Sequence, residues 1–335
     1  MNFRVKRRRF GQLAIFSAAT TLLANLASKV FAQQSEQLYG VLLAPVSKNI
    51  TVDLVDAAAA NTTPAVVIQS IDLAALLTAE VSLVTDILAS TVNNPQEATV
   101  TVNKALVVKK PSERITGFTV LSDNTLMIAA TAETKKGSFS RLLLTKSSKE
   151  IKKKPSKGLK IKKTKDKKYS TVESLLATTI QGNQILSVVS LAEGTPPFEL
   201  AFIDSNSGQV DYRAQLGLPE LPANQRLSNL AQSPDGTIYA TSSGTEGVLL
   251  VQVDLANKSR ITGRGKIIGL VVLSFNNKPL ENDLASLAFS SSGQLFALAD
   301  PNYEGTNSLF VVDIKTGGMT LLRKFAVDKI AFARA

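Results

Sequence analysis

The chain is organised around a recurring unit, which is clearest in residues 283–318, DLASLAFSSSGQLFALADPNYEGTNSLFVVDIKTGG. Apolar runs at 295–299 and 309–312 alternate with polar turns, and β-branched and aromatic residues fill the runs. This pattern is typical of an antiparallel sheet. Gly293 suits a turn position with positive φ, which costs glycine little. A chain that repeats such a unit is restricted to repeat architectures.

Weaker copies of the unit lie at residues 115–126, 172–185 and 227–238. Asn124 takes the glycine place in the first of them, and Asn tolerates a left-handed conformation best after Gly. If the last residue of each copy is equivalent to Leu295, the spacings are 59, 53 and 57 residues. Four-stranded units with periods of roughly 40–50 residues predict the blades of a β-propeller. A β-sandwich of unrelated hairpins is the alternative.

The two ends of the chain predict how the ring closes. Residues 37–42 match the second strand of the unit, and residues 327–332 match its first strand. A blade shared between the termini would remove a free sheet edge. Residues 72–76 also resemble 283–287, which adds a blade between Ile71 and Val108, although this stretch is rich enough in Leu and Ala to be helical. We therefore expect six blades, with five or seven as alternatives.

The repeat resembles the broad β-propeller superfamily of the WD40, YVTN and NHL type over most of residues 37–335. The resemblance rests on the Ser-x-x-Gly turn at 290–293 and on strands that end in Asp-x-x-x-Gly at 204–208 and 313–317. The sequence departs from WD40 because it contains neither Trp nor His. The resemblance implies an all-β architecture and not a particular function.

Residues 1–32 are interpreted as an export signal and residues 33–335 as a single mature domain. Arg7, Arg8 and Phe10 lie in an Arg-Arg-x-Phe sequence that resembles the twin-arginine signal. Small residues before position 33 predict cleavage after Ala32. The general secretory route and an uncleaved anchor are alternatives, but the apolar stretch is shorter and more polar than a span of about 20 residues. We expect export to the bacterial periplasm or an equivalent compartment, and a mature chain without a membrane span.

Charge is concentrated in one insertion. Residues 146–168 hold twelve Lys against two acidic residues, and the signal holds six more of the 38 basic residues. The rest of the mature chain has 20 basic and 25 acidic residues, so its body is mildly acidic. Like charges and the breaks at Pro155 and Gly158 predict an exposed, mobile segment. The candidate binding residues are Lys152, Lys153, Lys154, Lys157, Lys160, Lys162, Lys163, Lys165, Lys167 and Lys168.

This insertion has two interpretations. It is either a contact with an anionic lipid, acidic polysaccharide or acidic protein surface, or a solvated loop that aids solubility. A stretch with so few aromatic residues lacks the stacking platforms for single-stranded nucleic acid, so we expect no nucleic-acid partner.

The amino-acid composition also restricts which catalytic mechanisms and metal sites are possible. The absence of His and Cys excludes Ser-His-Asp and Cys-His catalysis and thiolate metal sites. Pairs of carboxylates remain available for glycoside chemistry. The loops between second and third strands carry a glutamate in four copies, and such oxygens can hold Ca²⁺. The alternative is that these side chains are merely solvated. The four glutamates in these loops are Glu133, Glu193, Glu246 and Glu304.

The sequence therefore predicts an exported, monomeric β-propeller that acts as a binding or scaffold protein through its Lys-rich insertion, with no catalytic residues and no required cofactor. The alternative is a propeller hydrolase or lyase that works through carboxylates or Ca²⁺. The ligand is not specified by the sequence.

Overall fold

The computed structural model describes residues 36–46, 63–74, 76, 101–107, 113–134, 137–146, 159–160, 171–178, 184–192, 194–211, 225–257 and 263–333. The chain divides into two compact units. Unit 1 comprises residues 1–37 and 71–99, and unit 2 comprises residues 38–70 and 100–335. The described part of unit 1 is short, and in it Leu73 N donates a hydrogen bond to Glu36 O at 2.9 Å.

Unit 2 is built from five small sheets, as far as the described residues show. The first has the order β22-β1-β2-β3 and the second the order β4-β5-β6-β7, and the third is β11-β10-β9-β8. The strands of these three sheets are β1 (Gln37–Val46), β2 (Thr63–Asp72), β3 (Thr101–Val107), β4 (Glu113–Val120), β5 (Thr125–Thr134), β6 (Gly137–Lys146), β7 (Leu159–Lys160), β8 (Thr171–Ala177), β9 (Gln184–Ala192), β10 (Thr195–Asp204), β11 (Val210–Asp211) and β22 (Lys329–Phe332).

The fourth sheet has the order β12-β13-β14-β15, and the fifth has six strands in the order β17-β16-β21-β20-β19-β18. In the fifth sheet β16 pairs in parallel with β21 and covers its edge, an addition that the sequence did not predict. The strands are β12 (Arg226–Gln232), β13 (Ile238–Gly244), β14 (Gly247–Asp254), β15 (Lys266–Val272), β16 (Ser274–Phe275), β17 (Lys278–Pro279), β18 (Ser286–Phe289), β19 (Leu295–Ala299), β20 (Ser308–Val312) and β21 (Gly318–Lys324).

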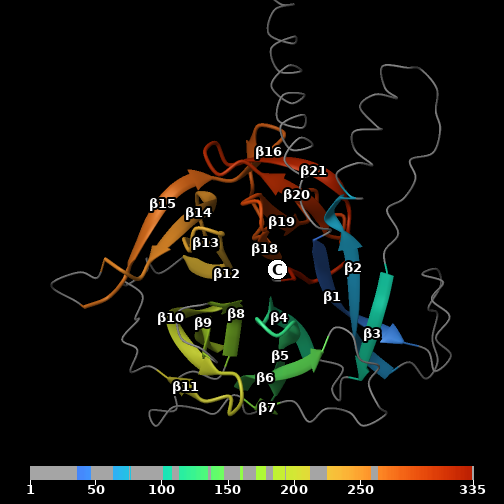
Figure 1. Cartoon of the computed structure of the whole chain (residues 1–335). Helices are drawn as coiled ribbons and strands as arrows, with labels where there is room; N and C mark the ends of the chain where they lie inside the picture. Colours follow the sequence, from blue (N-terminus) through green and yellow to red (C-terminus); the bar gives the residue numbers. More distant parts are fainter. Residues whose placement is uncertain are drawn as a thin grey trace, which may run out of the picture. The chain divides into compact units, whose positions relative to one another are not determined.

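The sheets of unit 2 are arranged around a common centre in the way of propeller blades (Figure 1). One strand of each sheet is innermost, and these inner strands contact one another in the order β22, β4, β8, β12, β18 and β22 again. The predicted pairing of the two chain ends is present, because β1 pairs antiparallel with β22 and Leu38 faces Phe332. The all-β prediction is therefore confirmed in unit 2.

The blade expected between Ile71 and Val108 is not seen among the described residues. The strand found there, β3, pairs with β2 and serves as the outer strand of the first sheet. The inner strand of that sheet is β22, near the C-terminus, and β3 is its fourth strand. Residues 75 and 77–100 lie outside the described residues.

The turns of the repeat have the backbone conformations that the sequence predicts. Gly293, Gly236 and Asn124 have φ values of 83°, 89° and 58°. At the strand ends, Asp204 Oδ1 accepts hydrogen bonds from Asn206 N and Ser207 N, at 3.0 and 2.6 Å. These bonds satisfy backbone donors at the turn, so the repeated aspartates are structural.

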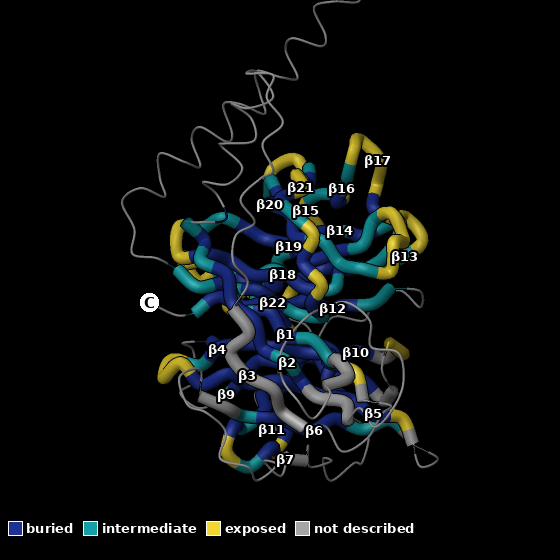
Figure 2. Tube along the Cα trace, turned by 90° about the vertical axis from the view of Figure 1, so that its right-hand side faces the viewer, coloured by how far each residue is buried: buried dark blue, intermediate teal, exposed yellow. Residues whose placement is uncertain are grey.

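Most strands are buried along their length, whereas many turns and the outer strand β15 are exposed (Figure 2). Apolar side chains form buried clusters that join strands of neighbouring sheets. Hydroxyl groups on the inner strands fasten neighbouring sheets to one another. Ala177 N donates to Thr119 Oγ1 at 3.0 Å, and Leu230 N donates to Ser174 Oγ at 2.8 Å. Ile330 N donates in the same way to Ser286 Oγ, at 3.1 Å. These buried bonds link neighbouring inner strands at different points along their length.

Candidate functional site at the starts of the inner strands

Most of the residues that the sequence singles out lie outside the described part. This applies to the export signal with Arg7, Arg8, Phe10 and Ala32, to Glu193, and to the Lys-rich insertion apart from Lys146 and β7. Within the insertion, Leu159 and Lys160 form β7, which pairs with β6 as the outer strand of its sheet. The insertion therefore contributes a strand to the fold.

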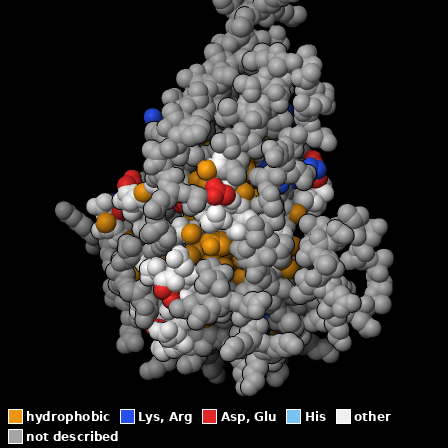
Figure 3. Space-filling model, turned by 45° about the vertical axis from the view of Figure 1, so that its right-hand side comes forward, with side chains coloured by type: hydrophobic (Ala, Val, Ile, Leu, Met, Phe, Trp, Pro, Cys, Tyr) orange, Lys and Arg blue, Asp and Glu red, His pale blue; other side chains and the backbone are white. Residues whose placement is uncertain are grey.

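The three described glutamates of the predicted Ca²⁺ site are all exposed. Glu133 Oε1 lies 3.4 Å from Arg114 Nη2, and Glu304 Oε2 lies 2.8 Å from Lys324 Nζ. Over the described residues, no three acidic side chains form a group that could hold a metal ion. Acidic side chains form separate small groups on the face in Figure 3. Two of these glutamates thus form ion pairs with basic side chains of the protein.

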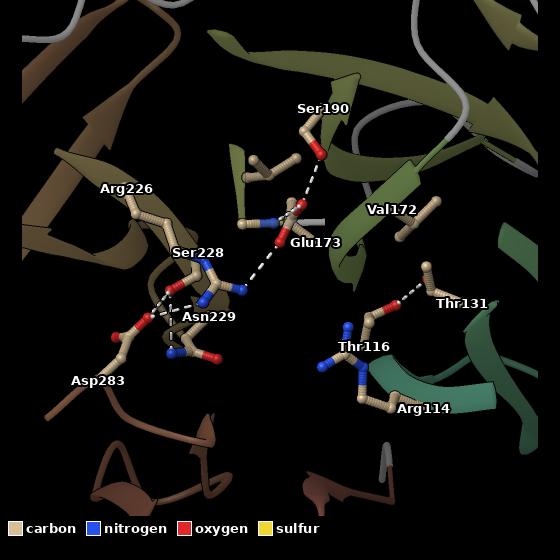
Figure 4. Close-up of polar contacts among 12 residues, drawn as sticks. Arg114, Thr116, Thr131, Val172, Glu173, Ser190, Arg226, Ser228, Asn229 and Asp283 are labelled. Atoms are coloured by element: carbon tan, nitrogen blue, oxygen red, sulfur yellow. Dashed lines mark hydrogen bonds and ion pairs between the residues drawn. The ribbon is translucent and has the colours of Figure 1, made fainter. Parts of the chain in front are cut away.

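A different set of polar side chains gathers where the inner strands begin (Figure 4). In each antiparallel sheet, the start of the inner strand lies beside the end of the second strand, as Arg226 lies opposite Ser243. The loops that follow the second strands are therefore at this same end. We call this set the axial cluster, and it comprises Glu173, Arg226, Ser228, Asn229, Asp283 and Lys329.

Glu173 is the most deeply buried charged residue of the axial cluster, with a side chain 0 % exposed. It occupies a bulge in β8, between Val172 and Ser174, and the bulge directs its side chain away from the regular alternation. Its Oε1 accepts hydrogen bonds from Ser190 Oγ at 2.5 Å and from Gly194 N at 2.8 Å. Its Oε2 accepts from Arg226 Nη2 at 2.9 Å, so both carboxylate oxygens are engaged.

Arg226 extends from β12 between two carboxylates. Opposite Glu173, its Nη1 lies 3.6 Å from Asp283 Oδ2. Asp283 Oδ2 also accepts a hydrogen bond from Ser228 Oγ at 3.2 Å, and its Oδ1 accepts from Leu284 N at 2.9 Å. The Arg226 side chain remains 37 % exposed, against 23 % for Asp283. The two carboxylates thus fix a guanidinium group that solvent still reaches.

Asn229 and Lys329 complete the axial cluster. Asn229 has a φ of 53° in a bulge of β12, and its Nδ2 donates to Leu284 O at 2.8 Å. Lys329 Nζ donates to Ala285 O and, at 3.4 Å, to Asn229 Oδ1. Burial, together with the positive charge of Arg226, lowers the pKa of Lys329 to about 8.

A periodic signal in the sequence could have located this site. Arg114, Glu173, Arg226 and Asp283 each stand twelve residues before the equivalent anchor positions Leu126, Ile185, Ile238 and Leu295. A charge at the same place in each repeat, at the start of an otherwise apolar strand, is unusual for a residue that only packs. Its sign alternates around the repeats, which favours ion pairs between neighbouring sheets.

The contacts of the axial cluster limit its chemistry. A general base needs a free oxygen within reach of the proton that it removes. Glu173 has hydrogen-bond donors on both oxygens, and so has Asp283. These bonds hold the two carboxylates and the Arg226 guanidinium in a fixed orientation.

The sequence matches no family model, and no curated protein sequence matches it. Solved structures resemble it weakly. A candidate gluconolactonase is 11 % identical with a TM-score of 0.41, over 79 % of this chain and 76 % of the other. A Lactobacillus plantarum protein is 12 % identical with a TM-score of 0.38, over 90 % and 100 %. Prolyl oligopeptidase B from Galerina marginata is 10 % identical with a TM-score of 0.36, over 81 % and 32 %. Likenesses of this strength carry no argument about function.

In the part of the chain that the structure describes, no helix has both the length and the apolar character needed to span a membrane.

Proposed function

We propose that this chain is an exported binding protein built on a five-bladed β-propeller, whose ligand site is the axial cluster. The observation that carries this proposal is the engagement of both Glu173 and Asp283 in holding Arg226. A guanidinium fixed from two sides loses little freedom when it meets a ligand, and this favours binding. Carboxylates whose oxygens already hold the protein's own donors favour a binding role over a hydrolytic one.

Closure of the ring is part of the same proposal. The pairing of β1 with β22 supports it, because the last strand of the chain then completes the blade that the first strand begins. Ile330 is buried there and is fastened to Ser286 of β18. The last strand must be present before such a ring can close, and this suits export in the folded state, which the twin-arginine resemblance implies. We place it in the periplasm or an equivalent compartment, as a monomer.

The Lys-rich insertion is proposed as a second contact, with an anionic lipid, acidic polysaccharide or acidic protein surface. Lysines near an anionic membrane contribute about 1 kcal/mol each, and the contribution falls steeply with salt. Since Leu159 and Lys160 form β7, deletion of the whole insertion would also remove a strand. Replacing the insertion's other lysines with Gln is therefore the cleaner variant.

The experiment compares the mature chain with this Lys→Gln variant in cosedimentation with anionic and neutral vesicles over a salt series. Binding of the mature chain to anionic vesicles that weakens with salt, and its loss in the variant, is the expected result. Equal behaviour of the two proteins would identify the insertion as a solvated loop.

Catalysis is tested separately. The mature chain is incubated with chromogenic glycosides and lactones, with and without Ca²⁺, and compared with Glu173→Gln and Asp283→Asn. We expect no turnover by any of them. Turnover that disappears in a folded Glu173→Gln or Asp283→Asn protein would overturn the binding proposal in favour of the hydrolase or lyase. A melting temperature that rises with Ca²⁺ and no longer does so in Glu246→Gln would instead restore the predicted metal site.

A further inference from the structure

The outer strand of the fourth sheet, β15, leaves a long edge of that sheet free. Strand β15 has seven residues, whereas the outer strands β7, β11 and β17 have two residues each. It pairs with β14 on one side, and no strand of the described part pairs with its other side (Figure 1). In the fifth sheet, by contrast, β16 and β17 extend the sheet beyond β21. A free edge presents backbone N–H and C=O groups that can pair with another chain.

The side chains of this edge are apolar as well as exposed. Among the described residues, three of the five exposed large apolar side chains lie on β15, namely Ile268, Leu270 and Val272, which are 41 %, 37 % and 41 % exposed. Leu270 stands at a bulge, where it has no partner in β14. Ile267 and Val271, between the exposed positions, pack against the buried clusters instead. The alternation therefore gives β15 one side that joins the core and one apolar side that faces solvent.

Backbone bonds hold the end of β15 in place, so its edge is already formed. Leu273 N, directly after the strand, donates to Val248 O at 2.8 Å, and Ser274 N donates to Gly317 O at 2.9 Å. The first bond ties β15 to its own sheet and the second ties it to the start of β21. A strand that is already ordered loses little conformational entropy when a partner strand is added.

Basic side chains precede the apolar positions. Arg264 and Lys266 are both exposed, and Lys266 is the first residue of β15. Asp254 of β14 lies across from Lys266, but its oxygens accept hydrogen bonds from Ala256 N and from two nitrogens of Asn257. The Asp254 carboxylate is thus engaged in its own turn. A carboxylate on an added strand would complement the basic end of β15.

A second copy of this chain complements the edge less well. Two antiparallel β15 strands centred on Gly269 would place Lys266 of each copy beside Val272 of the other. Each ammonium group would then lie beside an apolar side chain and gain no carboxylate. A different partner with an acidic residue at that place supplies the charge that a second copy lacks.

We propose that β15 is a docking edge for an extended segment of another protein, which joins the fourth sheet as a further antiparallel strand. The segment carries apolar residues at three alternate positions, beside Val272, Leu270 and Ile268, and then an acidic residue beside Lys266. Antiparallel pairing is slightly more stable per residue than parallel pairing. This surface is separate from the axial cluster, so the inference goes beyond the proposed function.

The probe is a fluorescent peptide, Gly-Ser-Val-Thr-Ile-Thr-Val-Thr-Glu-Gly, whose binding to residues 33–335 is measured by anisotropy. The variants are Ile268→Thr and Val272→Thr, and the matched control is Leu321→Thr, because Leu321 is a 45 % exposed apolar residue of β21. Thr is favoured in strands, so all three proteins should fold, and their melting temperatures check this. We expect the two β15 variants each to weaken binding by about fivefold and the control to leave it unchanged.

Two further comparisons separate strand addition from general apolar contact. Lys266→Glu should weaken binding by about threefold, and a peptide with Lys in place of its Glu should restore it. Two more peptides are N-methylated at alternate residues, one at the odd and one at the even positions. Only one of them should lose binding, because the N–H groups that face β15 belong to alternate residues of an added strand.

Three outcomes of the peptide experiments would overturn the proposal: no binding at about 1 mM peptide, an equal loss in Leu321→Thr, or equal binding of both N-methylated peptides. Sedimentation velocity of the chain alone tests the other occupant. A dimer that Ile268→Thr disrupts would assign the edge to a second copy and would also overturn the proposal.

Discussion

Replacing Glu173 with Gln tests how strongly the axial cluster is held together. The substitution keeps the shape of the side chain and removes its charge, and it places an amide NH₂ or a neutral oxygen against Arg226 Nη2, 2.9 Å away. Breaking a buried ion pair costs about 3–5 kcal/mol. Arg226 is 37 % exposed and retains Asp283 at 3.6 Å, which reduces this cost. We expect a loss of about 2–3 kcal/mol in the free energy of unfolding.

The loss is measured by urea unfolding of the proposed mature chain, residues 33–335, with folding of the variant checked by circular dichroism. Glu246→Gln is the matched control, because Glu246 is an exposed glutamate in the β13–β14 loop at the same end. It should change the stability by less than about 0.5 kcal/mol. In a double-mutant cycle, Arg226→Gln should couple to Glu173→Gln by about 1–2 kcal/mol. A loss at Glu173 no larger than at Glu246, or a coupling near zero, would refute the reasoning.

Three further predictions concern the frame around the site. Gly317→Ala should prevent stable folding, because at a φ of 74° the added Cβ meets the carbonyl oxygen of the last residue of β15. Gly236→Ala, at a φ of 89° with no atom within 4 Å of the added Cβ, should cost about 1 kcal/mol in the free energy of unfolding. Urea unfolding compares the two variants, and equal losses would contradict the steric argument. Ser286→Ala should cost about 1–2 kcal/mol because Ile330 N loses its acceptor and the contact between β18 and β22 weakens. Limited proteolysis at the C-terminus should accelerate, and an unchanged cleavage rate would show that this bond does not hold β22 in place. The folded-state pKa of Lys329 is about 8, below its ordinary value of 10.5, so the folded state resists protonation of this side chain. The free energy of unfolding should therefore rise between about pH 8 and 10.5, by up to about 3 kcal/mol. If a Lys329→Met protein shows the same rise, Lys329 is not its cause.

Some of this protein could be predicted from its sequence because the information is local. Alternating apolar runs and turn residues determine strands and hairpins over a few residues, so Gly293, Asn124 and the Asp204 turn were predictable. The match of residues 37–42 and 327–332 to neighbouring strands of the repeat predicted their pairing for the same reason. The sequence left the blade number open between five, six and seven, because whether residues 101–107 complete one sheet or start another depends on which strand they meet.

The axial cluster was decided by the tertiary structure. Glu173, Arg226 and Asp283 are separated by more than 50 residues in sequence at each step, and only the contact between inner strands brings them together. The bulge at Glu173 directs a charged side chain into a buried network, and no local pattern specifies which partner it meets there. The sequence alone determined strands, turns and the recurrence of a charge at one place in each repeat. The three-dimensional packing of the sheets decided that those charges meet, because ion pairs and desolvation depend on neighbours that are distant in the chain.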